Sequence, residues 1–390
     1  LALVTAWHLV WAAASGMETM LFGTLTLALI ALAWRELDER STSTRGYLLR
    51  GAAFGALSAL TAATRPEGVL LAALIGIAML AARPQGSWRG FAGWAVGAAL
   101  AFALVISPYL AYNLQLTGGV LPDTAAAKQA EYAALLALPY PARVLSLLYP
   151  LTAGVQLLLV PGAVALAAWL VSRLRQSRKA ILLLVPLMWS AALVALYAAR
   201  LPATYQHGRY VIPALPAFIV CGVVGTAWLL QAGRRSLTGR VATRALSIAA
   251  VVSALIFALV IGLNAYRQDV RIIEEEMVSV ARWIAANVPP ERLLAVHDIG
   301  AVGYYAPRPI LDLAGLVTPE VIPIFRDADA LWTLMETRGV AYLMALPDQV
   351  PGQNASDPRL CPIYSTGGAT ASSLGNSNMT VYEVTWEETC

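Results

Sequence analysis

Long apolar runs separated by short polar connections constrain this chain more than any other feature. A helix that crosses a bilayer needs about 20 mostly apolar residues, and the 390-residue chain contains many such runs. We find a partial segment at 1–14 and eight full segments at 17–34, 47–64, 67–82, 90–112, 150–172, 180–199, 210–231 and 245–264. Only 13% of the residues are charged, roughly half the share in a soluble domain. The sequence therefore predicts a polytopic α-helical membrane protein.

The number of basic residues alternates between high and low in successive connections, which predicts the orientation of the chain in the membrane. One alternate set holds fourteen, namely Arg35, Arg40, Arg45, Arg50, Arg83, Arg89, Arg173, Arg175, Arg178, Lys179, Arg234, Arg235, Arg240 and Arg244. The other set holds five, namely Arg65, Lys128, Arg143, Arg200 and Arg209. Connections rich in Lys and Arg face the cytoplasm. The first set is therefore predicted to be cytoplasmic and the chain after residue 264 extracytoplasmic.

The composition changes at the end of the last apolar segment. Residues 1–264 have a net charge of +12, whereas residues 265–390 have a net charge of −8. In the second part we predict helices at 274–287 and 328–338, strands at 293–296, 310–313, 340–345 and 380–386, and irregular structure at 347–378. The sequence thus predicts a membrane domain at 1–264 and a small C-terminal α/β extracytoplasmic domain at 265–390.

Several classes of site are absent from the pattern. The basic and acidic parts have separate surfaces, so the overall net charge of +4 does not indicate binding of nucleic acid. The pair His297 and Asp298 supplies at most two metal ligands, and no second cluster has metal spacing, so no metal is predicted.

Cys361 and Cys390 both lie in the acidic part. A bridge between them requires an oxidising compartment, and both a bridge and two free thiols stay open.

Ionisable residues in the predicted extracytoplasmic connections form four clusters on one side of the membrane. The clusters hold Glu18; Arg65 and Glu67; Asp123 and Lys128; and His207, Arg209 and Tyr210. Each has a local interpretation: a helix-start carboxylate, a turn-stabilising pair, a snorkelling lysine and an interfacial anchor, respectively. Arg has a planar fork that binds phosphate through two hydrogen bonds, and a helix N-terminus also attracts anions. Because all four clusters share one side, we favour a common binding site.

The connection at 111–149 is longer than a simple turn. Loops beyond about 12–15 residues are usually functional or disordered. This one contains Pro122, Pro139 and Pro141, with an amphipathic stretch at 125–138 between them. We predict that this stretch is a helix lying in the membrane interface, where Lys128 could present its ammonium group to a phosphate.

Together these segments resemble one family. Ser15-Gly-Met-Glu18-Thr, Arg65-Pro-Glu67-Gly, Leu121-Pro-Asp123-Thr-Ala-Ala-Ala-Lys128 and His207-Gly-Arg209-Tyr210-Val-Ile-Pro-Ala-Leu-Pro look like motifs of bacterial GT-C integral-membrane glycosyltransferases. The nearest groups are the protein-mannosyltransferase/aminoarabinose-transferase superfamily and the mycobacterial arabinofuranosyltransferases. His297-Asp298-Ile-Gly-Ala-Val-Gly303-Tyr304-Tyr and Leu311-Asp312-Leu-Ala-Gly-Leu316-Val are similar to the soluble domain of such enzymes.

The resemblance implies a GT-C-like helix bundle in the bacterial plasma (inner) membrane. It implies a membrane glycosyltransferase that moves a sugar from a polyprenyl-phosphate donor to a glycan, lipid or protein acceptor outside the cytoplasm. By analogy, Lys128, Arg209 and Arg65 contact the phosphate, while Glu18 and Glu67 order the cavity or contact the sugar. No cofactor beyond this donor substrate is implied.

Two departures from the family pattern affect the expected chemistry. Related sequences usually carry Asn where this chain has Asp123, and a carboxylate beside a phosphate is unfavourable unless it is paired. The family's catalytic base is typically an acidic residue in the first extracytoplasmic loop, which this chain does not contain. We therefore expect that the chain is truncated and that the base lies upstream of Leu1.

Two other functions are compatible with the sequence. A transporter or flippase of a lipid-linked substrate would have charged residues at mid-membrane and repeat-related broken helices. The span interiors here are almost free of charge, which disfavours it. A non-catalytic membrane scaffold that displays the acidic domain is the third hypothesis.

Overall fold

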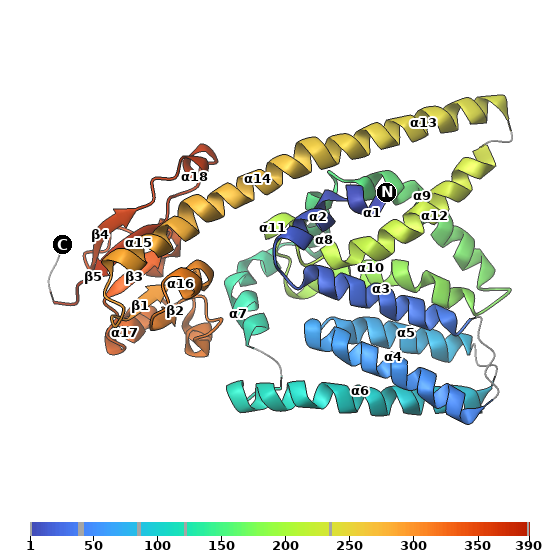
Figure 1. Ribbon diagram of the computed structural model, residues 1–390, viewed down its shortest axis with the longest axis horizontal. Helices are drawn as coiled ribbons and strands as arrows, with labels where there is room; N and C mark the ends of the chain where they lie inside the picture. The colour runs from blue at the N-terminus through green and yellow to red at the C-terminus, as the bar shows by residue number, and fades with distance from the viewer. Residues whose placement is uncertain (1, 38–42, 84–86, 121–122, 234–235, 388–389) are drawn as a thin grey trace. The chain divides into compact units, whose positions relative to one another are not determined.

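The computed structural model describes residues 2–37, 43–83, 87–120, 123–233, 236–387 and 390. These residues form two compact units (Figure 1). The first unit comprises residues 1–121 and 135–263, and the second comprises residues 122–134 and 264–390. The segment at 122–134, which the sequence analysis placed in an interfacial loop of the membrane domain, thus groups with the C-terminal part of the chain.

The first unit is a bundle of helices. Its elements are α1 (Ala2–Thr5), α2 (Trp7–Ala14), α3 (Thr19–Arg35), α4 (Thr44–Thr64), α5 (Gly68–Ala82), α6 (Trp88–Thr117), α8 (Tyr140–Leu148), η2 (Tyr149–Leu151), α9 (Val155–Arg173), α10 (Ala180–Arg200), α11 (Tyr205–Gly208), η3 (Ile212–Ala214), α12 (Leu215–Gly233), α13 (Leu237–Ile256) and η4 (Phe257–Gly262). Serine side chains cap the N-termini of three long helices. Ser43, Ser87 and Ser236 each accept a hydrogen bond from a backbone N–H of the first turn.

Each of the eight predicted spans coincides with a helix, but not every helix has the length and composition of a span. Five of the described helices could cross a membrane, or six if α2 and α3, which are bent by 120°, count as one span. The prediction of eight full spans includes two further helices, α4 and α5, which do not have both the length and the hydropathy of these five. α5 has only 15 residues, and α4 contains Arg45, Arg50 and many small or hydroxyl residues in place of large apolar ones. The chain is nevertheless a polytopic helical membrane protein.

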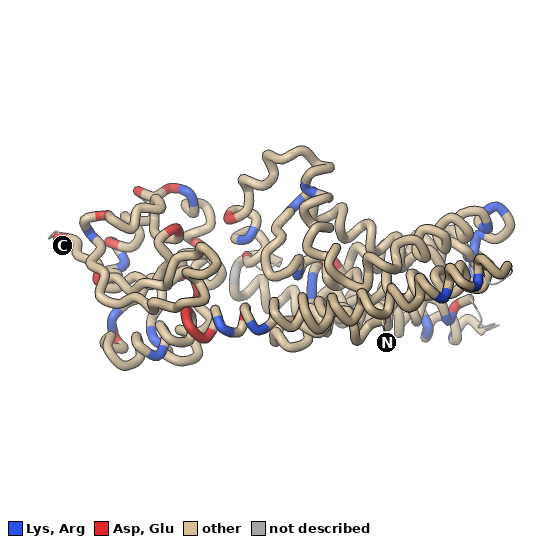
Figure 2. The backbone as a smooth tube through the Cα atoms, turned by 90° about the horizontal axis from the view of Figure 1, so that it is seen from above, with Lys and Arg blue, Asp and Glu red and all other residues tan. Residues whose placement is uncertain are grey.

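Basic residues gather at one end of the first unit (Figure 2). α3 and α9 end at Arg35 and Arg173, and α4 and α6 begin beside Arg45 and Arg89. Because successive helices run in opposite directions, the connections that carry these residues meet at the same end. Arg40, Arg234 and Arg235 lie outside the described residues.

Glycines allow two helix pairs to approach closely. A Cβ atom on Gly51 of α4 would lie 1.9 Å from the carbonyl oxygen of Trp94 in α6, and one on Gly55 would lie 2.0 Å from that of Ala98. A Cβ atom on Gly225 of α12 would lie 1.9 Å from the carbonyl oxygen of Gly162 in α9. Small residues at helix crossings are the usual means of packing helices in lipid, where no hydrophobic effect drives them together.

The second unit contains a five-stranded mixed sheet. Its elements are α7 (Thr124–Glu131), η1 (Ala133–Ala137, shared with the first unit), α14 (Leu263–Ile272), η5 (Ile273–Val278), α15 (Ser279–Asn287), β1 (Leu294–Val296), α16 (Ile299–Tyr305), β2 (Ile310–Asp312), η6 (Pro319–Ile324), α17 (Ala328–Thr337), β3 (Tyr342–Ala345), η7 (Pro347–Gln349), η8 (Pro351–Gln353), β4 (Leu360–Ser365), α18 (Ala369–Ser373) and β5 (Thr380–Val384). The strand order is β2-β1-β3-β5-β4. β1 pairs in parallel with β2 and β3, whereas β5 is antiparallel to β3 and β4.

Side chains alternate across this sheet and bury both of its faces. Leu294 and Val296 of β1 pack in one cluster with α15 and α16, while Ala295 packs in the other cluster with α17. This period of two is what an extended strand imposes on successive residues. The predicted small C-terminal α/β domain is therefore confirmed.

One strand of the sheet was not predicted. The stretch at 347–378 was expected to be irregular, but Leu360–Ser365 forms β4. Pro362 lies within it, and proline is tolerated in a sheet only where its missing N–H is not needed, as on an edge strand. β4 is the edge strand beside β5, so the proline that argued against a strand is compatible with this position.

The predicted interfacial helix at 125–138 is also shorter than expected. α7 ends at Glu131, and the chain continues as the 3₁₀ helix η1.

The two cysteines of the second unit form a disulfide. Cys361 of β4 is bonded to Cys390, with their Cα atoms 5.5 Å apart. Of the two possibilities that the sequence left open, the structure has the bridge. Cys221 of α12 is a buried free thiol.

Candidate functional site

Four of the predicted site residues meet at the end of the first unit opposite the basic connections. Glu18 precedes α3, Arg65 and Glu67 occupy the turn between α4 and α5, and Arg209 follows α11. These positions are all connections between helices, and they converge because each adjoining helix starts or ends at this end of the bundle. Ion pairs link the four side chains into one cluster.

Arg65 is the most enclosed member of this cluster, with 6% of its surface exposed. Its Nη2 donates a hydrogen bond to the Tyr197 hydroxyl at 2.6 Å, and its Nε lies 3.5 Å from Oε2 of Glu67. Its guanidinium carbon lies 5.4 Å from the ring centre of Phe22 and 5.7 Å from that of Tyr210. A guanidinium over aromatic faces gains cation–π attraction, more so where water is excluded. The aromatic rings and the carboxylate together fix this charge in place.

Arg209 and Arg65 approach the same oxygen of Glu18. Glu18 Oε1 lies 3.7 Å from Nη2 of Arg209 and 3.9 Å from Nη1 of Arg65. Both distances are too long for a hydrogen bond. Nη1 of Arg65 and Nε of Arg209 are buried and have no hydrogen-bond partner among the described residues. The two arginines therefore hold hydrogen-bond donors that no group in the described part of the chain satisfies.

Tyr197 is a site residue that the sequence analysis missed. Its hydroxyl accepts the hydrogen bond from Arg65 and donates one to Oε1 of Glu67. Its ring stacks on that of Tyr210, with centres 5.0 Å apart, and the Tyr210 hydroxyl is 2.6 Å from that of Tyr205. The only signal in the sequence is a tyrosine near the end of an apolar helix, which is also typical of an aromatic residue at the membrane interface.

The backbone before Arg209 is strained. Gln206 and His207 have φ values of +53° and +57°, and Gly208 has +77°. Residues other than glycine rarely adopt this left-handed backbone conformation, because it costs them about 1–2 kcal/mol each. The His207 ring packs edge-on against the rings of Trp7 and Trp11, at 5.2 and 5.1 Å. Strain of this kind persists where the surroundings fix it, and it is concentrated at functional sites.

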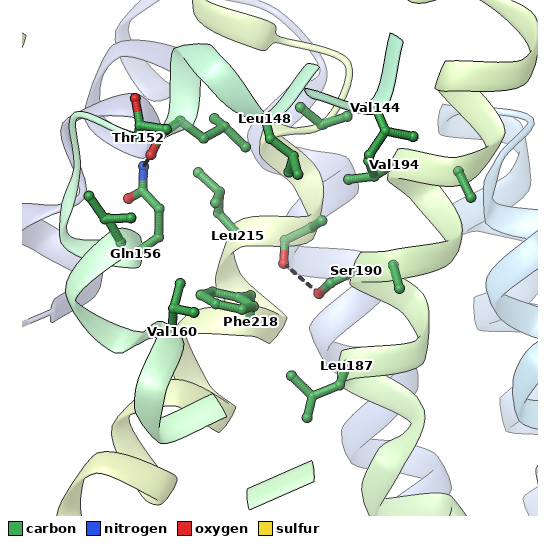
Figure 3. A pocket seen from close by; sticks show the side chains of 16 residues that line it. Val144, Leu148, Thr152, Gln156, Val160, Leu187, Ser190, Val194, Leu215 and Phe218 are labelled. Carbon is green, nitrogen blue, oxygen red and sulfur yellow. Dashed lines mark hydrogen bonds between the residues drawn. The ribbon is translucent and has the colours of Figure 1, made fainter. Parts of the chain in front are cut away.

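An apolar cavity of about 580 Å³ lies in the first unit (Figure 3). It is lined by Val144, Leu148, Leu151, Thr152, Gln156, Leu157, Val160, Leu187, Ser190, Ala191, Val194, Ala195, Val211, Ala214, Leu215 and Phe218. Ser190 is one of its few polar residues, and its hydroxyl is within hydrogen-bonding distance of the carbonyl oxygens of Pro186 (2.9 Å) and Ala214 (3.2 Å). The walls are thus suited to hydrocarbon.

Two residues that line this cavity are close in the sequence to residues of the charged cluster. Val211 and Ala195 line it, and they are two residues away from Arg209 and Tyr197, respectively.

The other two predicted site residues belong to the second unit. Lys128 of α7 forms an ion pair with Glu131 at 2.6 Å. Asp123 precedes α7, but its side chain makes no capping hydrogen bond. Leu121 and Pro122, which belong to the same motif, lie outside the described residues. No group of three or more His, Cys, Asp or Glu among the described residues could hold a metal ion.

Comparisons with known proteins give a structural match but no close sequence relative. A family model described as "Domain of unknown function (DUF8728)" matches residues 258–384. No curated protein matches the chain. The crystal structure of ArnT from Cupriavidus metallidurans in the apo state aligns with a TM-score of 0.51 and 15% sequence identity, over 98% of this chain and 76% of that chain. The chain has the fold of that protein.

A second crystal structure of ArnT from Cupriavidus metallidurans is bound to undecaprenyl phosphate. It aligns with a TM-score of 0.46 and 15% identity, over 98% of this chain and 77% of that chain.

Proposed function

We propose that this protein is a membrane glycosyltransferase whose first unit binds the phosphate of a polyprenyl-phosphate-linked sugar. The sugar is transferred to a glycan, lipid or protein acceptor outside the cytoplasm. The observation that carries the proposal is the pair of arginines around Glu18. Arg65 and Arg209 flank one carboxylate oxygen at distances too long for hydrogen bonds, and each has a buried N–H group with no hydrogen-bond partner among the residues that the structure describes.

A phosphate oxygen satisfies these donors better than Glu18 does. Arginine binds phosphate through parallel N–H···O bonds that are about twice as strong as neutral ones. In our proposal the phosphate enters between Arg65 and Arg209, and the Glu18 carboxylate, whose side chain is 38% exposed, moves aside. Since the phosphate is the leaving group, these cations also stabilise the negative charge that develops on it during transfer.

The carboxylates of the cluster have positioning roles in this proposal. Glu67 accepts a hydrogen bond from Tyr197, which in turn accepts one from Arg65. This chain of hydrogen bonds holds the Arg65 guanidinium in one orientation. Because Glu18 and Glu67 are paired with arginines, we assign the general base to neither of them.

The apolar cavity provides a place for the polyprenyl chain. Its volume of about 580 Å³ lies within the range of small-molecule sites, which is about 300–1,000 Å³. Its walls are almost entirely aliphatic, which matches an isoprenoid chain.

Two independent features support the proposed orientation. Basic connections at one end of the first unit favour the cytoplasm, so the arginine cluster lies on the opposite side. The disulfide between Cys361 and Cys390 favours an oxidising compartment for the second unit. In a bacterium, both features support the plasma (inner) membrane with the C-terminal domain outside the cytoplasm.

The experiment that tests the proposal is a transfer assay in proteoliposomes made from the full-length gene product. Polyprenyl-phosphate donors carrying a labelled hexose or pentose are supplied, with a cell-envelope extract as the acceptor. We expect label in the acceptor, and a loss of at least about a hundredfold for Arg209→Ala, the scale seen when one transition-state donor is removed. Arg200→Ala removes an equal charge from an exposed position at the same end and should retain transfer.

The same assay distinguishes the competing functions. Unchanged transfer in Arg209→Ala would overturn the proposal. Donor that crosses the bilayer without releasing its sugar would indicate a flippase instead.

A further inference from the structure

A second cavity lies entirely within the second unit. Its volume is about 710 Å³, which is again within the range of small-molecule sites. Three segments supply most of its lining: the end of α7 with the start of η1, the connection from η6 into α17, and the turns of η7 and η8. His297 and Leu313, which follow β1 and β2, complete it. None of the residues used in the proposed function lines this cavity.

The walls of this cavity differ in chemistry from those of the apolar cavity. Asp348 and Glu131 supply carboxylates, Arg326 supplies a guanidinium, and Tyr132 and Phe325 supply rings. Both signs of charge are present, so the lining does not select a strongly charged ligand. Carboxylates, amides and guanidinium groups bind hydroxyl groups as acceptors and donors, and aromatic faces bind C–H surfaces. A saccharide presents hydroxyl groups around its edge and C–H groups on its faces.

Several polar groups at the cavity are not used by the protein. The side chains of Asp348, Arg326 and Gln353 make no hydrogen bond or ion pair within the described part of the chain. Nδ1 of His297 is buried and has no hydrogen-bond partner there either. Asp348, Arg326 and Gln353 are exposed, so their side chains are free to bind a ligand in place of water. The buried Nδ1 of His297 is different, because an orphaned buried polar group costs about 1–3 kcal/mol, and a polar ligand would offset part of that cost.

The loop that carries part of this lining is also held in a strained conformation. Gly352 has φ +74° and Gln353 has φ +56°. A left-handed residue other than glycine is uncommon in proteins and is found more often at binding sites. Gln353 lies at the cavity wall.

We infer that this cavity is a saccharide-binding site, whose ligand is a neutral sugar of one to a few rings. Tyr132 and Phe325 contact the faces of the sugar, while Asp348, Arg326 and Gln353 bind its hydroxyl groups. The inference involves only the second unit, so it does not depend on the transfer reaction proposed for the first.

Saturation-transfer NMR on the whole chain in lipid nanodiscs tests the inference, because nanodiscs avoid detergents with sugar headgroups. The probes are α-1,6-mannobiose, α-1,5-arabinobiose and N,N′-diacetylchitobiose, with tetraethylene glycol as a non-saccharide reference. We expect saturation transfer from the protein to at least one disaccharide and no transfer to the tetraethylene glycol reference. Asp348→Asn and Arg326→Gln should each weaken the affinity about tenfold, as expected for one lost charge-assisted hydrogen bond.

Glu291→Gln is the matched control, since it neutralises an exposed carboxylate that lies outside the lining. It should leave binding unchanged. Asp348 and Arg326 are also exposed, so neither substitution disturbs the core, and loss of binding in either variant supports the site. No saturation of any of the three disaccharides, or equal affinity in both variants and the wild type, would overturn the inference. A chain that binds saccharide but transfers none would leave this inference intact and refute the proposed function alone.

Discussion

Tyr197 connects a guanidinium to a carboxylate inside the membrane unit, and Arg65 depends on this connection for its orientation. Glu18, Arg65, Glu67 and Arg209 could be identified from the sequence, because ionisable groups stand out beside apolar segments. Tyr197 could not, because a tyrosine near a helix end has the same appearance whether it anchors the interface or orders a site. The left-handed backbone before Arg209 was equally inaccessible, since Gln and His do not indicate positive φ.

Replacing Tyr197 by phenylalanine tests this positioning role. Tyr197→Phe keeps the ring that stacks on Tyr210 but removes the hydroxyl between Arg65 and Glu67. A hydrogen bond to a charged group contributes about 1.5–3 kcal/mol. We therefore expect the affinity for polyprenyl phosphate to fall by about tenfold or more while the chain still folds, as measured by lipid titration in nanodiscs. Tyr149→Phe, at an exposed tyrosine, is the control. Equal loss in both variants would show that the Tyr197 hydroxyl has no specific role.

Among the elements, helices were easier to predict than the strand at the sheet edge. Long apolar runs located the eight helices that coincide with the predicted spans, although α4 and α5 differ from typical spans. β4 was missed because the stretch at 347–378 is rich in Gly, Ser, Asn and Pro, a composition that is typical of loops. The apolar cavity was not predicted at all, since its walls come from helices far apart in the sequence.

Filling the apolar cavity tests whether the lipid chain lies there. Ala191 lines the cavity from α10, and Ala191→Phe should obstruct it. We expect about a tenfold lower affinity for undecaprenyl phosphate, equivalent to losing about two buried methylene groups. Affinity for the short geranyl phosphate should change little, because that chain needs less of the cavity. Ala168→Phe adds the same ring to an exposed position of α9 outside the lining. If Ala168→Phe and Ala191→Phe behave alike, the lipid chain lies elsewhere.

Glu276 joins helix η5 to the last loop of the second unit. It is 2% exposed, and its carboxylate accepts hydrogen bonds from the Met379 backbone N–H at 2.7 Å, from the Asn378 amide at 2.8 Å and from the Thr366 hydroxyl. Glu276→Ala leaves the buried Met379 N–H without this partner, at a cost of about 1–3 kcal/mol, and removes one acceptor each from Asn378 and Thr366. We expect faster hydrogen exchange at Met379 and a lower unfolding temperature. Glu274→Ala changes an exposed residue of the same helical segment and should alter neither measurement.

For the whole molecule, the sequence predicted a membrane part followed by an α/β part, and the structure has both. The grouping of residues 122–134 with the second unit could not be read from the sequence, because that segment has no charge or hydropathy signal in common with residues 264–390. The orientation of the chain in the membrane rests on the basic connections and on the disulfide.

Labelling of thiols in intact cells tests that orientation. Cells are treated with a thiol-trapping reagent, lysed, and labelled with a maleimide polymer before and after reduction. We expect Cys361 and Cys390 to become reactive only after reduction, because a disulfide persists outside the cytoplasm. Cys221, which is a buried free thiol, provides the internal reference. Two thiols that are trapped without reduction would place the second unit in the cytoplasm.

The most direct test of the central claim is whether Arg65 and Arg209 bind a lipid-linked phosphate. Native mass spectrometry of the protein released from nanodiscs can compare undecaprenyl phosphate with undecaprenol, which has the same chain and no phosphate. We predict preferential binding of the phosphate, a loss of this preference in the Arg65→Gln/Arg209→Gln double variant, and its retention in Arg200→Gln. Equal binding of the two lipids by the wild type, or an unchanged preference in the double variant, would contradict the account.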